Sequence, residues 1–371
     1  MQEINQPKVT VIIVAYNAEG IKNIFKECLD SALNLKYDNY EVIVVNNGST
    51  DRTREILEDY EKDLKIINLK RNLGLAGARN IAYENSKSEF VLLLDSDVIP
   101  EKDSLKELVK ISIKDNKIGA LGGIQVDYKK RNITGLGALI EIYGNNIFID
   151  SIPSIDEIKE SYYSYIPSAF LLVKRKVIGN TLHPKEFFTY SEDTELCFRI
   201  WSRGYYVKLI PIVACRHEFG TSVRSASIVK QNIIKKLNYS YHKNYATLLA
   251  TIYKKYLPNA LLLHVFSKLL TSPIVETINF PRYLLYRNNY NYIGAYYPLI
   301  NLTYLKHYMK TISTITEYGE NIPLLINIKG SWKYLFYYPR APYIKLNYYD
   351  SIIKDEDIFR SNRKFIITKN Y

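Results

Sequence analysis

Short apolar runs recur through the first part of the chain at the spacing of a repeated strand and helix. Four of them are mainly apolar and too short for buried helices: 9–15 (VTVIIVA), 41–45 (EVIVV), 64–69 (LKIINL) and 90–94 (FVLLL). Apolar runs of this length predict strands that are buried on both faces, as in a parallel sheet.

Amphipathic segments separate these runs. Between residues 21 and 32, apolar side chains recur at helical spacing, namely Ile21, Ile24, Phe25, Cys28, Leu29 and Ala32. We expect further helices up to about residue 60 and from the segment 71–80 onward. Strands that alternate with helices predict a three-layered α/β fold with a mostly parallel sheet and right-handed crossovers.

The alternation weakens after about residue 126. Residues 127–160 contain three glycines and have irregular polarity, which predicts loops around a site. A strand is expected at 169–173, a helix from Glu192 to near Gly204, and a further strand at 206–213.

The apolar run at 90–94 leads directly into Asp95 and Asp97. Parallel strands place their carboxyl ends at the crevice where ligands bind, so both carboxylates are expected at a binding site. Two hard oxygen ligands on a rigid strand end suit Mg²⁺ or Mn²⁺, and such ions usually bring substrate phosphates with them. The alternative is that the pair only caps the next helix. The acidic residues 192, 193 and 195 also have a simpler interpretation, compensation of the helix dipole.

Composition favours a globular chain in a reducing compartment. The sequence is 47% hydrophobic and 24% charged, and its three cysteines, Cys28, Cys197 and Cys215, form no C-x-x-C pair. The N-terminus lacks the apolar core of a signal peptide, and no run of 18 apolar residues predicts a transmembrane helix. We therefore expect a cytoplasmic protein.

Charge is distributed unevenly along the chain. Residues 1–223 carry 29 Lys and Arg against 31 Asp and Glu, a net charge of −2, whereas residues 224–371 carry 21 against 7, a net charge of +14. The second part also holds 21 of the 34 tyrosines. Its helical spacing of apolar residues, interrupted by prolines, predicts a mainly α-helical extension, and its charge predicts an anionic surface as partner.

Four groups of segments, in order, resemble the family 2 glycosyltransferases of the GT-A fold. They are VTVIIVAYN (9–17), VVNNGSTD (44–51), NLGLAGARN with LLLDSD (72–97), and YSEDTELCFR with RHEFGTS (190–222). The resemblance covers about residues 8–223 and implies a GT-A catalytic domain at 1–223, followed by the basic extension at 224–371. It further implies inverting transfer of a sugar from a nucleotide-diphosphate sugar to a glycan or polyprenyl-linked acceptor, with Mn²⁺ or Mg²⁺ on the diphosphate.

The resemblance also implies which residues form the site. Asp97, Asp95 and His217 would contact the metal. Inversion needs a carboxylate that deprotonates the acceptor hydroxyl, and this base would be Asp193, with Glu192 as second choice. The donor would be bound by Ala15, Tyr16, Asn17, Asn46, Gly74, Arg79, Asp95 and Ser96.

Asn46 departs from the family pattern, in which an Asp accepts a hydrogen bond from the nucleotide base. An Asn oxygen also accepts, but the side chain is neutral and adds an NH₂ donor. The departure weakens the expectation of a uridine diphosphate sugar.

Two other functions remain as alternatives. A sugar-phosphate nucleotidyltransferase also binds nucleotides on an α/β sheet, but it would need a Gly-rich basic loop after the first strand, and residues 16–20 (YNAEG) do not supply one. A non-enzymatic protein could use the basic, Tyr-rich part on nucleic acid, where stacking and cations serve. Periodic apolar faces fit a packed or interfacial surface better. We therefore expect no nucleic-acid partner, and peripheral contact of the extension with the anionic inner face of a membrane.

Overall fold

The computed structural model describes residues 6–129, 132–141, 146–150, 152–185 and 187–218, together with three short strands nearer the C-terminus. Its main sheet has the strand order β10-β12-β6-β11-β4-β1-β2-β3, with β5 paired to β12 and β7 paired to β6. The bounds are β1 Val9–Ala15, β2 Tyr40–Asn46, β3 Lys65–Asn68, β4 Phe90–Asp95, β5 Val98–Pro100, β6 Ile118–Asp127, β7 Ile133–Gly135, β10 Ser161–Tyr162, β11 Phe170–Lys174 and β12 Tyr206–His217.

The predicted α/β alternation is confirmed. Strands β4, β1, β2 and β3 are parallel to one another. In contrast, β11 runs antiparallel to both β4 and β6, so the sheet is mixed on this side. Strand β12 is parallel to β6. The predicted sheet is therefore correct in its first half and gains antiparallel strands in its second, since β5, β7 and β10 also pair antiparallel with their neighbours.

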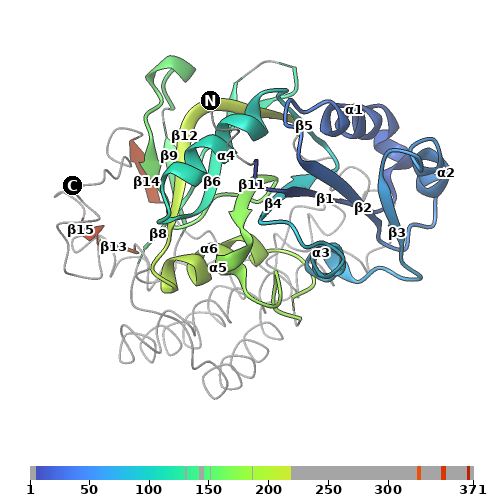
Figure 1. The fold of residues 1–371 in the computed structure, drawn as a ribbon. Coiled ribbons are helices and arrows are strands. Elements are labelled where there is room, and N and C mark those ends of the chain that lie inside the picture. The colour runs from blue at the N-terminus through green and yellow to red at the C-terminus, as the bar shows by residue number, and fades with distance from the viewer. Residues whose placement is uncertain are drawn as a thin grey trace, which may run out of the picture.

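Helices cover both faces of the sheet (Figure 1), as its alternating side chains require. One buried cluster joins Ile12 and Leu93 to α3, α5 and α6. The other joins Val11 and Leu92 to α1, α2 and α4. The helices are α1 Lys22–Leu33, α2 Thr53–Glu58, α3 Gly74–Glu84, α4 Ser104–Lys114, α5 Arg175–Ile178 and α6 Glu192–Ser202, with short 3₁₀ turns at Ala18–Ile21 and Ile155–Glu157.

The expectation of loops throughout 127–160 is wrong in part. Besides β7, this segment forms β8 Leu139–Glu141 and β9 Asn146–Asp150, which pair antiparallel with each other. Strands of three to five residues are too short to show a clear alternation of apolar and polar positions, so their hydrogen-bonding partners decide them.

Three strands from the C-terminal part join β8 and β9. Strand β13 (Leu324–Ile326) pairs with β8, β14 (Ile344–Asn347) pairs with β9, and β15 (Ile366–Ile367) pairs with β13, all in parallel. The helices predicted after residue 223 lie outside the described residues. Within the described part of the chain, no helix is long and apolar enough to cross a membrane.

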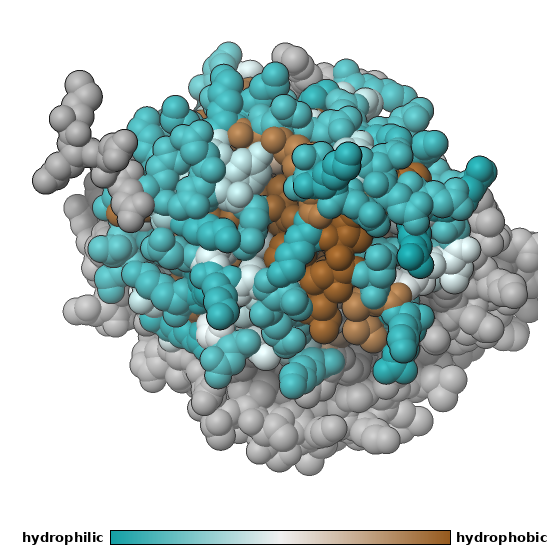
Figure 2. All heavy atoms as spheres, turned by 45° about the vertical axis from the view of Figure 1, so that its right-hand side comes forward, coloured by the Kyte–Doolittle hydropathy of each residue, from teal (hydrophilic) through white to brown (hydrophobic). Residues whose placement is uncertain are grey.

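The surface of the described part is mainly hydrophilic, with one apolar patch near the middle of the face shown in Figure 2. Among the described residues, the large apolar side chains that are well exposed are Ile113, Ile152 and Tyr190, at 38%, 38% and 42%. Tyr190 lies two residues before Glu192, the first residue of α6, and burial and then the charge of Glu192 raise the pKa of Tyr190.

Candidate functional site

The carboxyl ends of the central strands bring the predicted site residues into one row. In the sheet register, Val14 lies opposite Asp95, and Ala15 lies opposite Asn46, which in turn lies opposite Asn68. Parallel strands that end together leave a crevice at this edge. The structure thus places Asp95 and Asn46 on either side of the end of β1, as the sequence predicts.

Arg79 of α3 holds the first of the two strand-end carboxylates. Its Nη2 donates to Asp95 Oδ1 at 2.7 Å and to the carbonyl oxygen of Ser168 at 3.0 Å, and Nη1 donates to Ser168 Oγ at 2.7 Å. Arg79 is 1% exposed. A planar guanidinium can make these directed bonds at once, whereas a lysine could not. The guanidinium of Arg79 therefore binds Asp95 on one side and Ser168 on the other.

Asp97 and His217 meet on the other side of the strand end. His217 lies opposite Val98 in the antiparallel pair of β12 and β5, and its Nε2 is 3.5 Å from Asp97 Oδ1. The backbone N–H of Glu218 also donates to the carbonyl of Asp97 at 3.2 Å. This contact exists because β12 continues to His217, beyond the predicted end at residue 213. Ser96 lies half-buried between the two aspartates.

The start of α6 brings a second pair of carboxylates, Glu192 and Asp193. Both residues that precede it, Tyr190 and Ser191, have positive φ angles, 67° and 61°. Left-handed conformations in non-glycine residues store strain and cluster at functional sites. The Asp193 Oδ1 atom accepts the backbone N–H of Thr194 at 2.7 Å. The left-handed conformations of Tyr190 and Ser191 set the direction in which α6 begins, and so the direction from which the two carboxylates enter the site.

The carboxylates act on one another. Withdrawal from water, and then the charge of Asp193, raises the pKa of Glu192 to about 8. Burial likewise raises the pKa of Asp95, and Asp97 and Asp193 add to this effect while Arg79 opposes it. Burial also raises the pKa of Asp193. Burial and mutual repulsion therefore disfavour full ionisation of Asp95, Glu192 and Asp193 when no cation is bound.

These residues suit a divalent cation by the chemistry of their donor atoms. Carboxylate oxygens and an imidazole are ligands that Mn²⁺ accepts, and Mg²⁺ prefers oxygen. Among the described residues, no three His, Cys, Asp or Glu side chains already converge as a ready-made metal site. Asp97 and His217, whose side chains are in contact, could thus hold such an ion. Asp95 is instead hydrogen-bonded to Arg79.

Side chains of two asparagines make hydrogen bonds that hold the predicted donor-binding segments at the ends of β1 and β2. Asn17, in the left-handed region with φ 50°, accepts the N–H of Thr50 at 2.9 Å. Asn46 donates to Asn68 Oδ1 at 2.9 Å and accepts the N–H of Ser49 at 3.3 Å. Asn46 is therefore oriented as both donor and acceptor. Tyr16 is half-buried directly after β1.

Asn47 ties this end of the site to the start of α3. It accepts the N–H of Leu73 at 2.9 Å and donates to the carbonyl of Gly74 at 3.2 Å. Gly74 has φ 78°, and a Cβ atom here would lie 2.2 Å from the carbonyl oxygen of Phe188. Gly74 thus lets the segment before α6 approach α3. Asn47 was not among the predicted site residues, although it lies in the family-like segment VVNNGSTD at 44–51.

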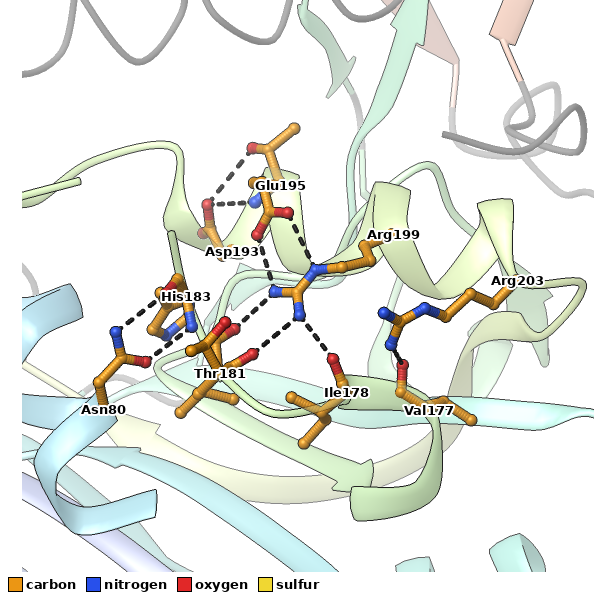
Figure 3. A network of polar contacts seen from close by, with 11 residues as sticks. Asn80, Val177, Ile178, Thr181, His183, Asp193, Glu195, Arg199 and Arg203 are labelled. Carbon is orange, nitrogen blue, oxygen red and sulfur yellow. Dashed lines mark hydrogen bonds and ion pairs between the residues drawn. The ribbon is translucent and has the colours of Figure 1, made fainter. Parts of the chain in front are cut away.

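A network of polar contacts fastens the segment 178–183 against α6 and α3 (Figure 3). Arg199 pairs with Glu195 through two contacts of 2.9 Å and donates to the carbonyls of Ile178, Thr181 and Leu182. Asn80 holds the backbone of His183 from the other side, with bonds of 2.9 and 2.8 Å. Sequence reasoning missed Ser168 and His183 as parts of the site's frame, because each is a lone polar residue outside the family-like segments. It gave no role to Arg199, although this residue ends the segment YSEDTELCFR.

Part of the chain is similar in sequence to known glycosyltransferases. The sequence model of Glycosyl transferase family 2 matches residues 10–177. The matched residues form a domain of the glycosyltransferase family 2 type. The chain is 28% identical over 215 residues to the probable glycosyltransferase YdaM of Bacillus subtilis. The aligned region covers 55% of this chain and 49% of YdaM. The chain thus spans about half the length of this relative.

Solved structures support the fold of the glycosyltransferase domain. TarS 1–349 of S. aureus, in complex with UDP-GlcNAc, matches with a TM-score of 0.50 and 17% identity over 83% of this chain and 91% of that one. GalNAc-T7 with UDP, GalNAc and Mn²⁺ matches with a TM-score of 0.50 and 18% identity over 66% of this chain and 51% of that one. The predicted GT-A type of fold and the family are therefore confirmed, and the roles of the single residues remain predictions.

Proposed function

We propose that this chain is an inverting glycosyltransferase that moves a sugar from a nucleotide-diphosphate sugar to a hydroxyl group of a glycan or lipid-linked acceptor. One observation carries the proposal: Asp95 at the end of β4 and Asp97 just after it lie in the same charged site as Glu192 and Asp193 of α6, around Arg79. The family supports sugar transfer, and the solved neighbours with UDP-GlcNAc, or with UDP and Mn²⁺, support this class of donor.

Asp97 and His217 would hold Mn²⁺ or Mg²⁺, with Asp95 beside them. When bound, the ion would neutralise the negative charge that develops on the leaving diphosphate. Arg79 orients Asp95 through its 2.7 Å contact and favours its ionised form against the effect of burial. A bound cation would favour the ionised forms of the Asp95 and Asp193 carboxyl groups and so offset the effect of burial on their pKa.

Asp193 would act as the general base, and its carboxylate would take the proton of the acceptor hydroxyl during attack. The Thr194 N–H keeps one oxygen, Oδ1, in place. Glu192 is the less suitable base, because its raised pKa of about 8 favours the protonated form at neutral pH. The environments of the two carboxyl groups thus support different roles.

The basic, Tyr-rich residues after 223 would dock the enzyme on an anionic membrane face. The net charge of +14 and the 21 tyrosines of this part support the proposal. Tyr favours the headgroup zone, and each basic residue near an anionic leaflet contributes on the order of 1 kcal/mol. Lipid-linked acceptors present their head groups at such a surface, so docking would bring acceptor and active site together.

The test of the main proposal is a screen of nucleotide sugars with Mn²⁺ or Mg²⁺ and glycan or lipid-linked acceptors, which measures the released nucleoside diphosphate. At least one donor should be turned over by the wild-type chain and not by Asp193→Asn. If a sugar phosphate and a nucleoside triphosphate gave pyrophosphate instead, the nucleotidyltransferase alternative would replace the proposal.

A further inference from the structure

Three buried side chains near the start of α6 carry polar atoms without a hydrogen-bond partner in the described part of the chain. They are Nε of Arg79, Oε2 of Glu192 and both ring nitrogens of His183. Arg79, Glu192 and His183 are 1%, 6% and 0% exposed, so solvent does not satisfy these atoms. Buried polar groups in folded proteins are almost always paired, and each exception needs an explanation.

These three residues lie close to one another. The charge of Arg79 acts on both His183 and Glu192. The His183 ring lies within reach of the Glu192 main chain but makes no hydrogen bond of normal geometry with it. Asn80, the residue after Arg79, binds the backbone of His183 through two hydrogen bonds, as Figure 3 shows. The three side chains are therefore neighbours in one buried region beside α3 and α6.

Their hydrogen-bonding capacities are complementary to a hydroxyl oxygen. Arg79 Nε can only donate. Burial, with the charges of Arg79 and Arg199, lowers the pKa of His183 well below its usual value, so the ring is neutral and offers one donor and one acceptor. Glu192 adds a carboxyl oxygen. An enclosed water typically makes about three such bonds to otherwise unsatisfied groups.

We propose that Arg79, His183 and Glu192 enclose a subsite for one hydroxyl oxygen, and that His183 is a positioning residue that orients Glu192 through it. The oxygen belongs either to a fixed water or to a hydroxyl group of the donor sugar. Because Glu192 and Asp193 share the first turn of α6, orienting Glu192 also sets the direction of the proposed base. This inference rests on the function proposed above.

The test compares the wild-type enzyme with His183→Phe, which removes both nitrogens, and His183→Gln, which keeps one donor and one acceptor. The matched control is Ser202→Ala, since Ser202 Oγ is also buried and unpartnered but lies at the far end of α6. The measurements are Tm, and kcat and KM for the nucleotide sugar, from release of the nucleoside diphosphate.

His183→Phe should lower Tm and reduce kcat on the order of 10- to 100-fold, as expected when a reacting group is misplaced. His183→Gln should recover much of both values, and Ser202→Ala should match the wild type. An unchanged KM identifies the oxygen as water. A raised KM identifies it as a sugar hydroxyl, if a donor that lacks that hydroxyl binds wild type and variant equally.

A Tm above that of the wild type would overturn the subsite, because removing merely unsatisfied nitrogens stabilises a core. A lower Tm with wild-type kcat and KM would overturn the positioning role. If neither wild type nor Ser202→Ala released nucleotide from any donor, the proposed function would fail instead. The Tm comparison would then still decide whether the subsite exists.

Discussion

The Nη2 atom of Arg79 lies 2.7 Å from Oδ1 of Asp95, so the first carboxylate of the strand-end pair is bound to a buried cation of the protein itself. The second, Asp97, faces His217 instead. Two carboxylates one residue apart therefore stand in different environments. Asp95 is oriented from within the domain, and Asp97 is the one best placed to meet a metal ion.

The first prediction concerns this difference. Asp97→Ala should abolish the Mn²⁺-dependent part of nucleotide binding, and Asp95→Ala should reduce it strongly, because the cation loses its charged oxygen ligands. Isothermal titration calorimetry with a nucleoside diphosphate, with and without Mn²⁺, measures the effect. His217→Ala should weaken binding less, about 10- to 100-fold at most.

The control for these variants is Asp103→Ala, which removes an exposed carboxylate paired with Lys36. It should bind the nucleotide as the wild type does. Wild-type affinity of Asp97→Ala in the presence of Mn²⁺ would falsify the assignment of this residue.

Asp193→Asn should lower turnover by about 10²- to 10⁴-fold, the usual contribution of a general base. The amide keeps the shape of the carboxylate, so the affinity for the donor should stay close to that of the wild type. Stopped assays of released nucleoside diphosphate, together with donor titrations, separate the two quantities. If Asp193→Asn remained active while Glu192→Gln was dead, the two carboxyl groups would have exchanged roles.

Gly74→Ala should lower Tm and turnover together. An alanine at φ 78° is strained, and its Cβ would lie 2.2 Å from the Phe188 carbonyl oxygen, so the segment before α6 must move. We expect a loss of stability of about 1–3 kcal/mol. Thermal unfolding and activity assays measure it. Gly20→Ala is the matched control, because nothing lies within 4 Å of its added Cβ, and it should leave both values unchanged.

The stability of the metal-free protein should fall as pH rises from about 5 to about 8. The pKa of Glu192 is raised from 4.5 to about 8 in the folded state, so the folded protein binds this proton more tightly than the unfolded chain does. The resulting stabilisation is complete below the unfolded pKa and is lost as pH approaches the folded pKa. Burial of Asp95 and Asp193 acts in the same direction.

Unfolding by urea in the presence of a chelator, measured across this pH range, tests the sign. Glu192→Gln should flatten the decline, because an amide does not ionise. A decline of equal size in the variant would show that other groups cause it.

Full-length protein should co-sediment with vesicles that contain anionic lipid, and salt should weaken this binding as charges are screened. A variant with Lys235, Lys236, Lys254 and Lys255 changed to Gln should bind more weakly. Substitution is a better test than removal of residues 224–371, because β13 and β14 from that part pair with β8 and β9. Equal recovery in the supernatant with anionic and neutral vesicles would contradict the docking proposal.

Local pattern alone predicted the strands at 9–15, 41–45 and 90–94 and the helix at 192, because burial on both faces or on one face leaves a periodic mark in the sequence. It also placed Asp95 and Asp97 at a strand end. The order of the four family-like segments then predicted the fold of the domain. These features depend on residues that are neighbours in the chain.

Tertiary structure alone decided which distant side chains meet. The antiparallel β11 carries Lys174 back to Phe90, and the extension of β12 brings His217 to Asp97. Arg79 and Ser168 are 89 residues apart in the chain, and no periodicity records their contact. Such pairs depend on register and on the exclusion of water from a folded interior. The sequence therefore determined which chemical groups this protein has, and the packed sheet and helices determined which of them act together.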